Sequence, residues 1–218
     1  MATRKTPTPA LEGRKAAYVA RNRVALLRST QKVLAEIGPD ATIEQISEMA
    51  EVSVSTIYKH FENKDVLFAT ATIEAMRDWE LWIDQFLSTA KEPLEELVLP
   101  MRALLRIPQT HPLYARMIAN NLSAIPDYVP GISSGLSKHI KELIKAKILD
   151  MENPEIRIQS VSATLLAALS HQLLNPKARN ADADAAVEIA LGILGVAPSK
   201  AKKLAQAPLP TFGSANKH

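Results

Sequence analysis

The most constraining feature of the sequence is a pair of short helical segments joined by a tight corner near the N-terminus. Thr42 is followed three residues later by Gln45, which is the pattern of a capping box at a helix start. Ser53 is a typical N-cap residue for a second segment. The pattern predicts helices over Thr42–Glu51 and Val54–His60, which together have the dimensions of a helix-turn-helix.

Apolar periodicity assigns an inner and an outer side to each helix of this pair. The inner residues of the first helix are expected to be Ile43, Ile46 and Ala50. Those of the second helix are expected to be Val54, Ile57 and Phe61. The side chains that remain on the outer side of the second helix are Ser55, Thr56, Tyr58 and Lys59.

Longer helices are expected on both sides of the pair. Apolar residues at helical spacing predict a first helix over Ala16–Ile37, which Gly38–Pro39 ends. Asn63 is the expected N-cap of a fourth helix, which runs past Phe86 and is long enough to connect two domains.

The rest of the chain reads as further helices separated by prolines. We expect helices near 93–107, 112–122, 132–150, 154–175 and 182–195, and a loop over 123–131, which contains two prolines. Only seven glycines occur in 218 residues, too few for the many tight turns of an all-β protein. The fold class is therefore predicted to be all-α, with about nine helices.

Charge and composition suggest four segments along the chain. Residues 1–28 contain seven Lys or Arg and one acid, a net charge of +6, whereas the whole chain carries +3. Such a cluster suits phosphate contacts, although it also fits a solubilising arm. We expect a disordered basic arm (1–15), a helix-turn-helix domain (16–68), a helical ligand-binding and dimerisation domain (69–197) and a disordered tail (198–218).

Several classes of protein receive no support from the sequence. There is no cysteine, which removes disulfides and thiolate metal sites. The start of the chain lacks the apolar core of a secretory signal, and no stretch reaches the roughly 20 apolar residues of a membrane span. The five histidines are scattered, and the common nucleotide-binding and hydrolase motifs are missing. We therefore expect a cytoplasmic protein without membrane contact, enzymatic activity, metal or other cofactor.

The residues of the helix-turn-helix segment add a more specific indication. The runs ATIEQIS (41–47) and VSVSTIYKHFENKDVL (52–67), preceded by apolar residues at helical spacing up to Gly38, closely resemble the N-terminal signature of the TetR family. The resemblance covers about residues 20–70. It implies a homodimeric transcriptional regulator that binds double-stranded operator DNA, usually as a repressor, and whose variable helical body takes a small-molecule effector.

The resemblance also implies which side chains meet DNA. Thr42, Tyr58 and Lys64 correspond to phosphate contacts. Val54, Ser55, Thr56 and Lys59 are candidates for the edge of the major groove, where Lys59 could donate to guanine acceptors. His60 is a further candidate, with a packed core side chain as the alternative. For Lys64, the alternative is a solvated residue at the helix start.

Two residues depart from the family pattern. Glu51 replaces the glycine that is usual at the corner, and Ser47 replaces a small alanine. A residue with a side chain in a left-handed turn costs on the order of 1 kcal/mol. We therefore expect a less regular corner in this chain.

The body contains candidates for an effector pocket. Aromatic, methionine and amide side chains are typical of an apolar ligand site, although they are also typical of a core. The candidates are Trp79, Trp82, Phe86, Met117, Asn121 and Tyr128. We expect the pocket between the fourth helix and the helices near 112–122 and 154–175, and a mostly apolar ligand.

The last two expected helices, near 154–175 and 182–195, are rich in alanine and leucine. Such faces permit close helix packing, so a four-helix dimer interface is predicted, with an intramolecular core as the alternative. A charge at Leu165 or Leu191 is then expected to yield a monomer or an unfolded chain. A DNA-binding dimer without a small-molecule effector, such as an architectural or protein-partnered regulator, remains the alternative function.

Overall fold

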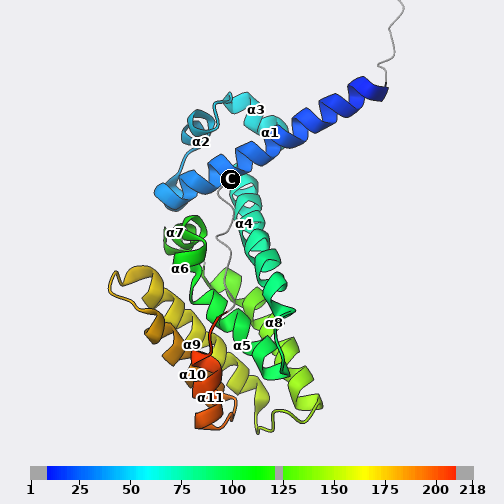
Figure 1. Cartoon of the computed structure of the whole chain (residues 1–218). Coiled ribbons are helices and arrows are strands. Elements are labelled where there is room, and N and C mark those ends of the chain that lie inside the picture. The colour runs from blue at the N-terminus through cyan, green and yellow to red at the C-terminus, as the bar shows by residue number, and fades with distance from the viewer. Residues whose placement is uncertain (1–8, 121–124, 210–218) are drawn as a thin grey trace, which may run out of the picture. The chain divides into compact units, whose positions relative to one another are not determined.

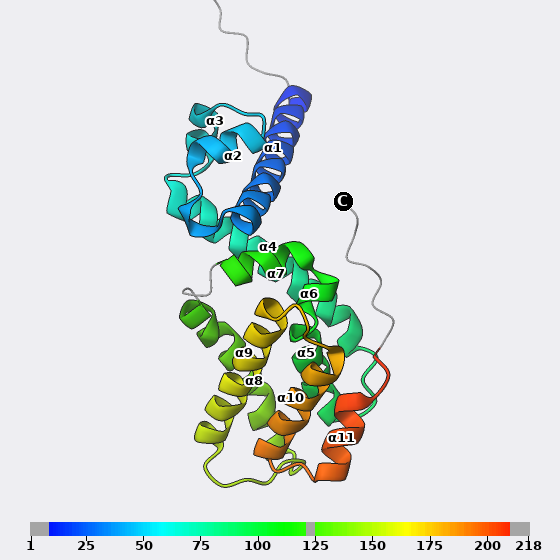
Figure 2. The same ribbon diagram turned by 90° about the vertical axis from the view of Figure 1, so that its left-hand side faces the viewer.

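The computed structural model describes residues 9–120 and 125–209, and within them all side chains except those of 9–18, 86 and 125–134. These residues form eleven α-helices and one short 3-10 helix, and no strand occurs among them (Figures 1 and 2). The elements are α1 (Pro9–Glu36), η1 (Gly38–Asp40), α2 (Ile43–Met49), α3 (Val54–His60), α4 (Lys64–Leu87), α5 (Pro93–Leu104), α6 (Ile107–Thr110), α7 (Pro112–Asn120), α8 (Ile125–Lys145), α9 (Pro154–Leu174), α10 (Asn180–Ile193) and α11 (Pro198–Gln206). The all-α prediction is confirmed.

The chain divides into two compact units, Met1–Ala75 and Met76–His218. We call them the N-terminal and the C-terminal unit. The boundary lies inside α4, seven residues beyond the division expected at residue 68. α4 therefore contributes residues to both units.

The N-terminal unit packs α2 and α3 against α1 and the start of α4. Of the expected inner residues, Ile43, Ile46, Ile57 and Phe61 are buried, whereas Ala50 and Val54 are half-buried. The same unit also buries side chains of the two longer helices, namely Leu26, Leu27, Val33, Leu34, Leu67 and Ala71. The two short helices thus share one apolar core with the long ones.

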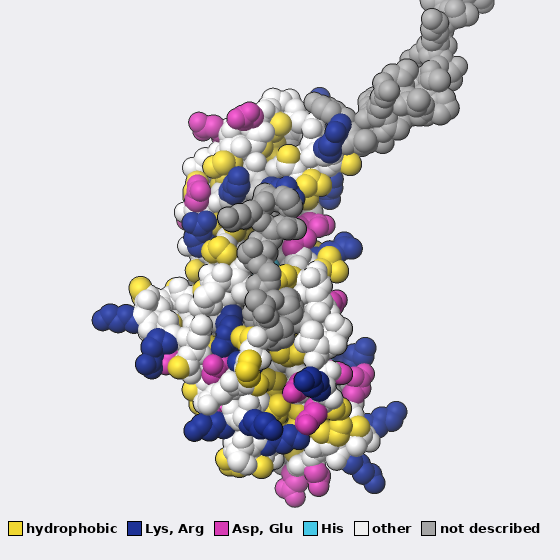
Figure 3. Space-filling view, viewed as in Figure 1, with side chains coloured by type: hydrophobic (Ala, Val, Ile, Leu, Met, Phe, Trp, Pro, Cys, Tyr) yellow, Lys and Arg dark blue, Asp and Glu magenta, His cyan; other side chains and the backbone are white. Residues whose placement is uncertain are grey.

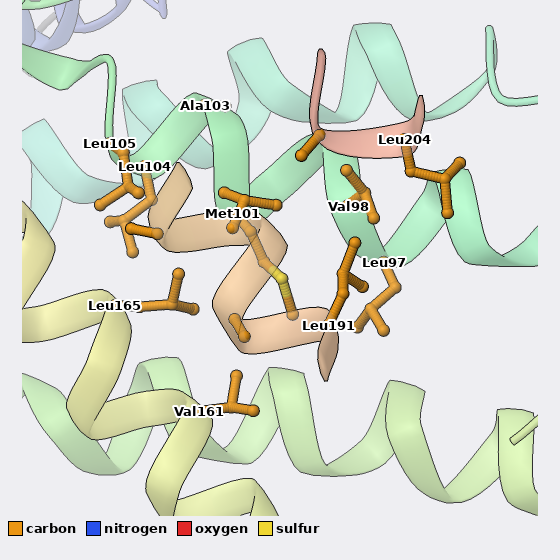
Figure 4. Packing of buried hydrophobic residues seen from close by; sticks show 14 of the residues in the cluster. Leu97, Val98, Met101, Ala103, Leu104, Leu105, Val161, Leu165, Leu191 and Leu204 are labelled. Carbon is orange, nitrogen blue, oxygen red and sulfur yellow. The ribbon is translucent and has the colours of Figure 1, made fainter. Parts of the chain in front are cut away.

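The C-terminal unit is built around α5, which is buried on most of its faces. α9 and α10 lie side by side, and α11 packs on both α10 and α5 (Figure 2). Figure 4 shows the side chains of these helices converging on one core. Those labelled include Leu97, Val98, Met101 and Leu104 of α5, Val161 and Leu165 of α9, Leu191 of α10 and Leu204 of α11.

Three expectations about helix limits are wrong. The loop predicted over 123–131 is helical from Ile125 onward, because Pro126 occupies the first turn of α8, where backbone N–H groups have no partner within the helix. Residues 198–206 of the expected disordered tail form α11, which buries Ala201, Leu204 and Ala205 on one face. The first helix begins at Pro9 and includes part of the expected arm.

The helix expected over 93–107 is divided into two. α5 ends at Leu104, and α6 begins at Ile107 with Pro108 in its first turn. Because proline has no N–H and clashes with the preceding turn, the first turn of a new helix is more favourable for Pro108 than the interior of α5. A new helix starts instead, and this accounts for part of the difference from nine helices.

A charged cluster lies within the apolar core of the C-terminal unit. Arg102 of α5 and Arg106, the N-cap residue of α6, are 3% and 7% exposed, and both guanidinium groups face Asp184 of α10. Arg106 Nη2 lies 2.6 Å and Arg102 Nε 3.4 Å from Asp184 Oδ1. Burial lowers the pKa of Arg102, and the charge of Asp184 opposes that shift. One carboxylate therefore compensates two buried cations.

Replacing Asp184 by Asn is expected to destabilise the C-terminal unit by about 3 kcal/mol, because two buried guanidinium groups lose their only described counter-charge. Both tryptophans belong to this unit, so urea unfolding followed by tryptophan fluorescence reports on it. The control is Glu188→Gln, one turn further along α10, which is expected to change stability by less than about 0.5 kcal/mol. Equal stability of the two variants would contradict the assigned role of Asp184.

Candidate nucleic-acid interface and ligand cavity

Hydroxyl groups organise the start of α3. Ser53 Oγ accepts a hydrogen bond from the backbone N–H of Thr56 at 3.2 Å, which confirms its role as N-cap. The same oxygen lies 2.9 Å from both Ser55 Oγ and Thr56 Oγ1. The cap therefore orients two of the side chains that were expected to face DNA.

The outer side of α3 carries the expected recognition residues. Ser55, Tyr58 and Lys59 are exposed, and Tyr58 is 52% exposed despite its aromatic ring. Val54, Thr56 and His60 are half-buried at the margins of this side. A large exposed aromatic side chain gains little from folding, so its position suits contact with another molecule.

Thr42 lies at the start of α2 and forms the predicted capping box with Gln45. Its hydroxyl oxygen accepts from the Gln45 N–H at 3.3 Å, and its own N–H donates to Gln45 Oε1 at 2.8 Å. The threonine side chain is thus fixed in an exposed position. Its hydroxyl hydrogen is not used in the capping box and can be donated outward.

Lys64 has a structural role that the sequence did not reveal. Its ammonium group donates to the carbonyl oxygens of Ala41 at 3.0 Å and Pro39 at 3.3 Å. It also lies 5.1 Å from the ring centre of Phe68. Lys64 thus ties the start of α4 to the turn before Thr42. One of its three N–H groups remains for a phosphate.

Two further contacts that the sequence analysis missed hold α3 and α4 against α1. The guanidinium of Arg23 lies 4.7 Å from the ring centre of Phe61, a cation–π distance. Gln31 Nε2 donates to the backbone oxygen of Ala71 at 3.0 Å. Both contacts join residues about 40 positions apart along the chain, where local sequence patterns give no signal.

The corner between α2 and α3 is left-handed at Glu51, as the family pattern implied. The φ angle of Glu51 is 53°, a conformation that glycine adopts without strain. The corner is nevertheless hydrogen-bonded, since the N–H of Val52 donates to Ser47 O at 3.0 Å. The expected irregularity is therefore confined to the strain of one residue.

The C-terminal unit contains a cavity of about 330 Å³. Residues of α4, α5 and α8 line it, together with Leu165 of α9. Its buried apolar lining includes Trp79, Ile83, Leu97, Met101, Leu104 and Leu165. Its polar lining consists of Glu80, Asp84, Glu96 and His139. The cavity thus has an apolar interior and ionisable groups in more exposed positions.

The cavity is only partly where the sequence placed it. Of the six expected ligand residues, Trp79 lines it. Met117 and Trp82 are buried elsewhere, and Trp82 packs edge-to-face against His111 at 4.9 Å. α5 and α8 provide walls that had been expected from α7 and α9, with α9 supplying only Leu165.

The other expected ligand residues lie outside the part of the chain that the structure describes. They are Asn121 and the side chains of Phe86 and Tyr128.

His111, which packs against Trp82, has a lowered pKa. Burial lowers the pKa of its imidazole, and the charge of Asp78 raises that pKa by less, so the neutral form is favoured.

None of the helices in residues 9–120 and 125–209 has the length and apolar character to cross a membrane. Within the same residues, no group of three or more His, Asp or Glu side chains is arranged to hold a metal ion.

An exposed helix in a helix-turn-helix, followed by a separate helical unit with a cavity, is an arrangement typical of DNA-binding transcriptional regulators. Residues 26–71 match the family described as bacterial regulatory proteins, tetR family. Residues 26–71 are accordingly a TetR-type N-terminal domain, and the chain is similar to the regulators of that family. No curated protein sequence matches it significantly.

Solved structures of similar fold include several regulators of this kind. RolR in complex with resorcinol has a TM-score of 0.69 and 20% identity, and the match covers 91% of this chain and 100% of RolR. The fatty acid degradation regulator FadR from Bacillus halodurans has a TM-score of 0.66 and 17% identity, and the match covers 87% of this chain and 97% of FadR. NalD is the secondary repressor of the MexAB-OprM multidrug efflux pump in Pseudomonas aeruginosa. It has a TM-score of 0.63 and 18% identity, and the match covers 81% of this chain and 96% of NalD. At these identities, the likeness concerns the fold.

Replacing Glu51 by Gly is expected to stabilise the N-terminal unit by up to about 1 kcal/mol, because glycine removes the left-handed strain. The neighbouring variant Ala50→Gly is the control, since Ala50 has a φ angle of −88°. There, glycine only adds freedom to the unfolded chain and is expected to cost about 0.5–1 kcal/mol. Calorimetric melting compares the two variants, and the same sign of change in both would contradict the argument.

Proposed function

We propose that this chain is a homodimeric repressor that leaves its operator when a small, mostly apolar molecule occupies the cavity of the C-terminal unit. The observation that carries the proposal is the combination of an exposed α3 surface in a TetR-type N-terminal domain with an apolar cavity that α4 helps to line. RolR, whose fold is similar, is known in complex with resorcinol, a small ring compound. That complex supports a comparable site here.

The DNA contacts are proposed to divide into two groups. Tyr58 and Thr42 carry exposed hydroxyl groups and no charge, which suits hydrogen bonds to phosphate oxygens. Ser55, Thr56 and Lys59 project from α3 and are proposed to reach base edges, with Val54 and His60 beside them. Lys64 is proposed to act mainly by holding the turn before Thr42 in place. Its remaining N–H is proposed to donate to a phosphate.

Release is proposed to pass along α4. This helix is continuous from Lys64 to Leu87, and it lines the cavity from Met76 onward. A ligand that prefers one position of the cavity-lining residues also biases the position of Lys64 and of the turn that it holds. By reciprocity, operator DNA must weaken ligand binding by the same factor as the ligand weakens DNA binding. A DNA-binding dimer without effector leaves the cavity unexplained.

The dimer is proposed to form through the outer faces of α9 and α10. Ile156 and Leu174 of α9 and Ile189 of α10 are 57%, 58% and 59% exposed. Small residues are exposed between them, namely Ala163 and Ala167 of α9 and Ala181 and Ala185 of α10. An exposed apolar face with small residues permits close packing against a second copy.

Leu165 and Leu191, the positions first expected to test the dimer, are unsuited to that purpose. They are 2% and 0% exposed within the core of a single subunit, so a charge at either is expected to unfold the unit.

We expect the purified protein to select specific, near-palindromic duplexes from genomic fragments, with an affinity that falls steeply with salt. A compound that releases these duplexes is expected to change the fluorescence of Trp79, which lines the cavity. Failure to enrich any duplex would contradict DNA recognition. If specific duplexes are enriched but no cavity-binding compound changes the affinity for them, the alternative of a regulator without a small-molecule effector is favoured.

Lys59→Ala is expected to alter the sequence preference, since a lost base contact costs about 1–3 kcal/mol at one position of the site. Tyr58→Phe is expected to weaken all duplexes about equally, because it removes a phosphate hydrogen bond. The control is Lys32→Ala, another exposed lysine, on α1. Binding to a library of single-base variants measures the difference. An unchanged preference in Lys59→Ala would remove that residue from the reading surface.

Ile189→Glu is expected to convert the dimer into a folded monomer, because the charge lies on the proposed α10 interface and outside the subunit core. Ile148→Glu is the matched control, since Ile148 is 40% exposed and lies after α8. Sedimentation at micromolar concentration gives the oligomeric state, and circular dichroism confirms folding. If Ile189→Glu and Ile148→Glu have the same oligomeric state, the proposed interface on α10 is wrong.

A further inference from the structure

We propose that the cavity of the C-terminal unit recognises organic cations, that is, compounds with an apolar body, a hydrogen-bond acceptor and a protonated amine. The inference rests on the proposed ligand-responsive function and specifies the chemistry of its ligand. It follows from three features of the lining: a buried apolar interior, carboxylates that outnumber the one basic side chain, and an indole N–H that lacks a partner among the described residues.

The interior provides the space for the apolar body. Ile83, Leu97 and Met101 are 6%, 3% and 3% exposed, and all of them line the cavity from α4 and α5. A volume of about 330 Å³ is in the range of small-molecule sites. Burial of a ring or alkyl chain against these side chains is favourable, but it does not distinguish one charge type from another.

The charged part of the lining is acidic. Glu80 and Asp84 lie one turn apart on α4, and Glu96 faces the cavity from α5. All three residues are exposed, so their carboxylates lie toward solvent rather than in the apolar interior. The basic partner in the lining is His139, whose Nε2 lies 3.9 Å from Glu96 Oε2, and the described lining includes neither lysine nor arginine.

The cavity lining contains three carboxylates and one histidine. On the face shown in Figure 3, blue basic and magenta acidic side chains are interspersed over the C-terminal unit. Three carboxylates against one histidine attract a cation and repel an anion, and the adjacent apolar surface strengthens that attraction by excluding water.

Trp79 supplies the third feature. It is 9% exposed and lines the cavity, and its indole Nε1 is buried without a hydrogen-bond partner among the described residues. A buried donor without an acceptor is unfavourable, so a ligand that places an oxygen there gains affinity. The ligand is therefore expected to combine an acceptor near Trp79 with a cation near Glu80, Asp84 and Glu96.

Three probes with the same apolar body test the proposal: phenoxybutylamine, phenoxybutanol and phenoxybutanoate. Each has a ring and an ether oxygen, and they differ only in the charge of the end group. Calorimetric titration of the full-length protein at neutral pH is expected to show the amine binding at least about tenfold more tightly than the alcohol, with the carboxylate weakest. Fluorescence of Trp79 reports the same titration.

A triple variant with Glu80→Gln, Asp84→Asn and Glu96→Gln is expected to bind the amine and the alcohol with affinities within about twofold of each other. The control triple variant, Asp150→Asn, Glu152→Gln and Glu155→Gln, makes the same change in net charge at exposed positions outside the lining. It is expected to keep the preference for the amine. Loss of the preference in both variants would show that net charge, and not the cavity, selects the cation.

Trp79→Phe removes the indole donor and keeps an aromatic ring, so all three probes are expected to bind about two- to tenfold more weakly. Trp82→Phe is the control, since Trp82 does not line the cavity. If the alcohol binds to the wild type as tightly as the amine, the cation inference is wrong and the proposed function stands. If none of the probes binds, both the cation inference and the small-molecule part of the proposed function are wrong.

Discussion

The recognition helix depends on side chains outside itself, because a helix of its length has no stability of its own in water. α3 contains seven residues, whereas isolated helices shorter than about 12–15 residues are marginal. Its position is set by Ile57 and Phe61, which are buried, and by the guanidinium of Arg23 over the Phe61 ring. The exposed surface of α3 is therefore as well ordered as the anchors on its opposite side. α1 serves as a scaffold for DNA recognition.

Features that depend on neighbouring residues were predictable from the sequence. The capping box of Thr42 with Gln45 and the N-cap at Ser53 join atoms three residues apart, so the residue types alone predict the hydrogen bonds. Lys64 is different, because its acceptors lie 23 and 25 residues away. A lysine at a helix start gives no sign that backbone carbonyls will hold it. Its sequence context suggested a phosphate contact or a solvated residue at the helix start.

The cavity could not be placed from the sequence for a related reason. Its walls arise where α5 and α8 pack on α4, and these contacts join distant parts of the chain. Aromatic and sulfur-containing side chains were expected in the cavity because of their chemistry, but Trp82 and Met117 are buried outside it. Glu96 had no distinguishing local pattern and would pass as a solvated helix residue. Only the fold gives it an apolar cavity as a neighbour.

α11 affects the order in which the chain can fold during synthesis. Its residues Ala201, Leu204 and Ala205 are buried, and α11 packs on α5 and α10. All residues of the N-terminal unit precede residue 76, so that unit can fold while the rest is still on the ribosome. α5 must wait for about 100 further residues before its last partner emerges. During that interval the nascent chain already carries a complete helix-turn-helix unit, while the C-terminal unit still exposes the apolar surface that α11 later covers.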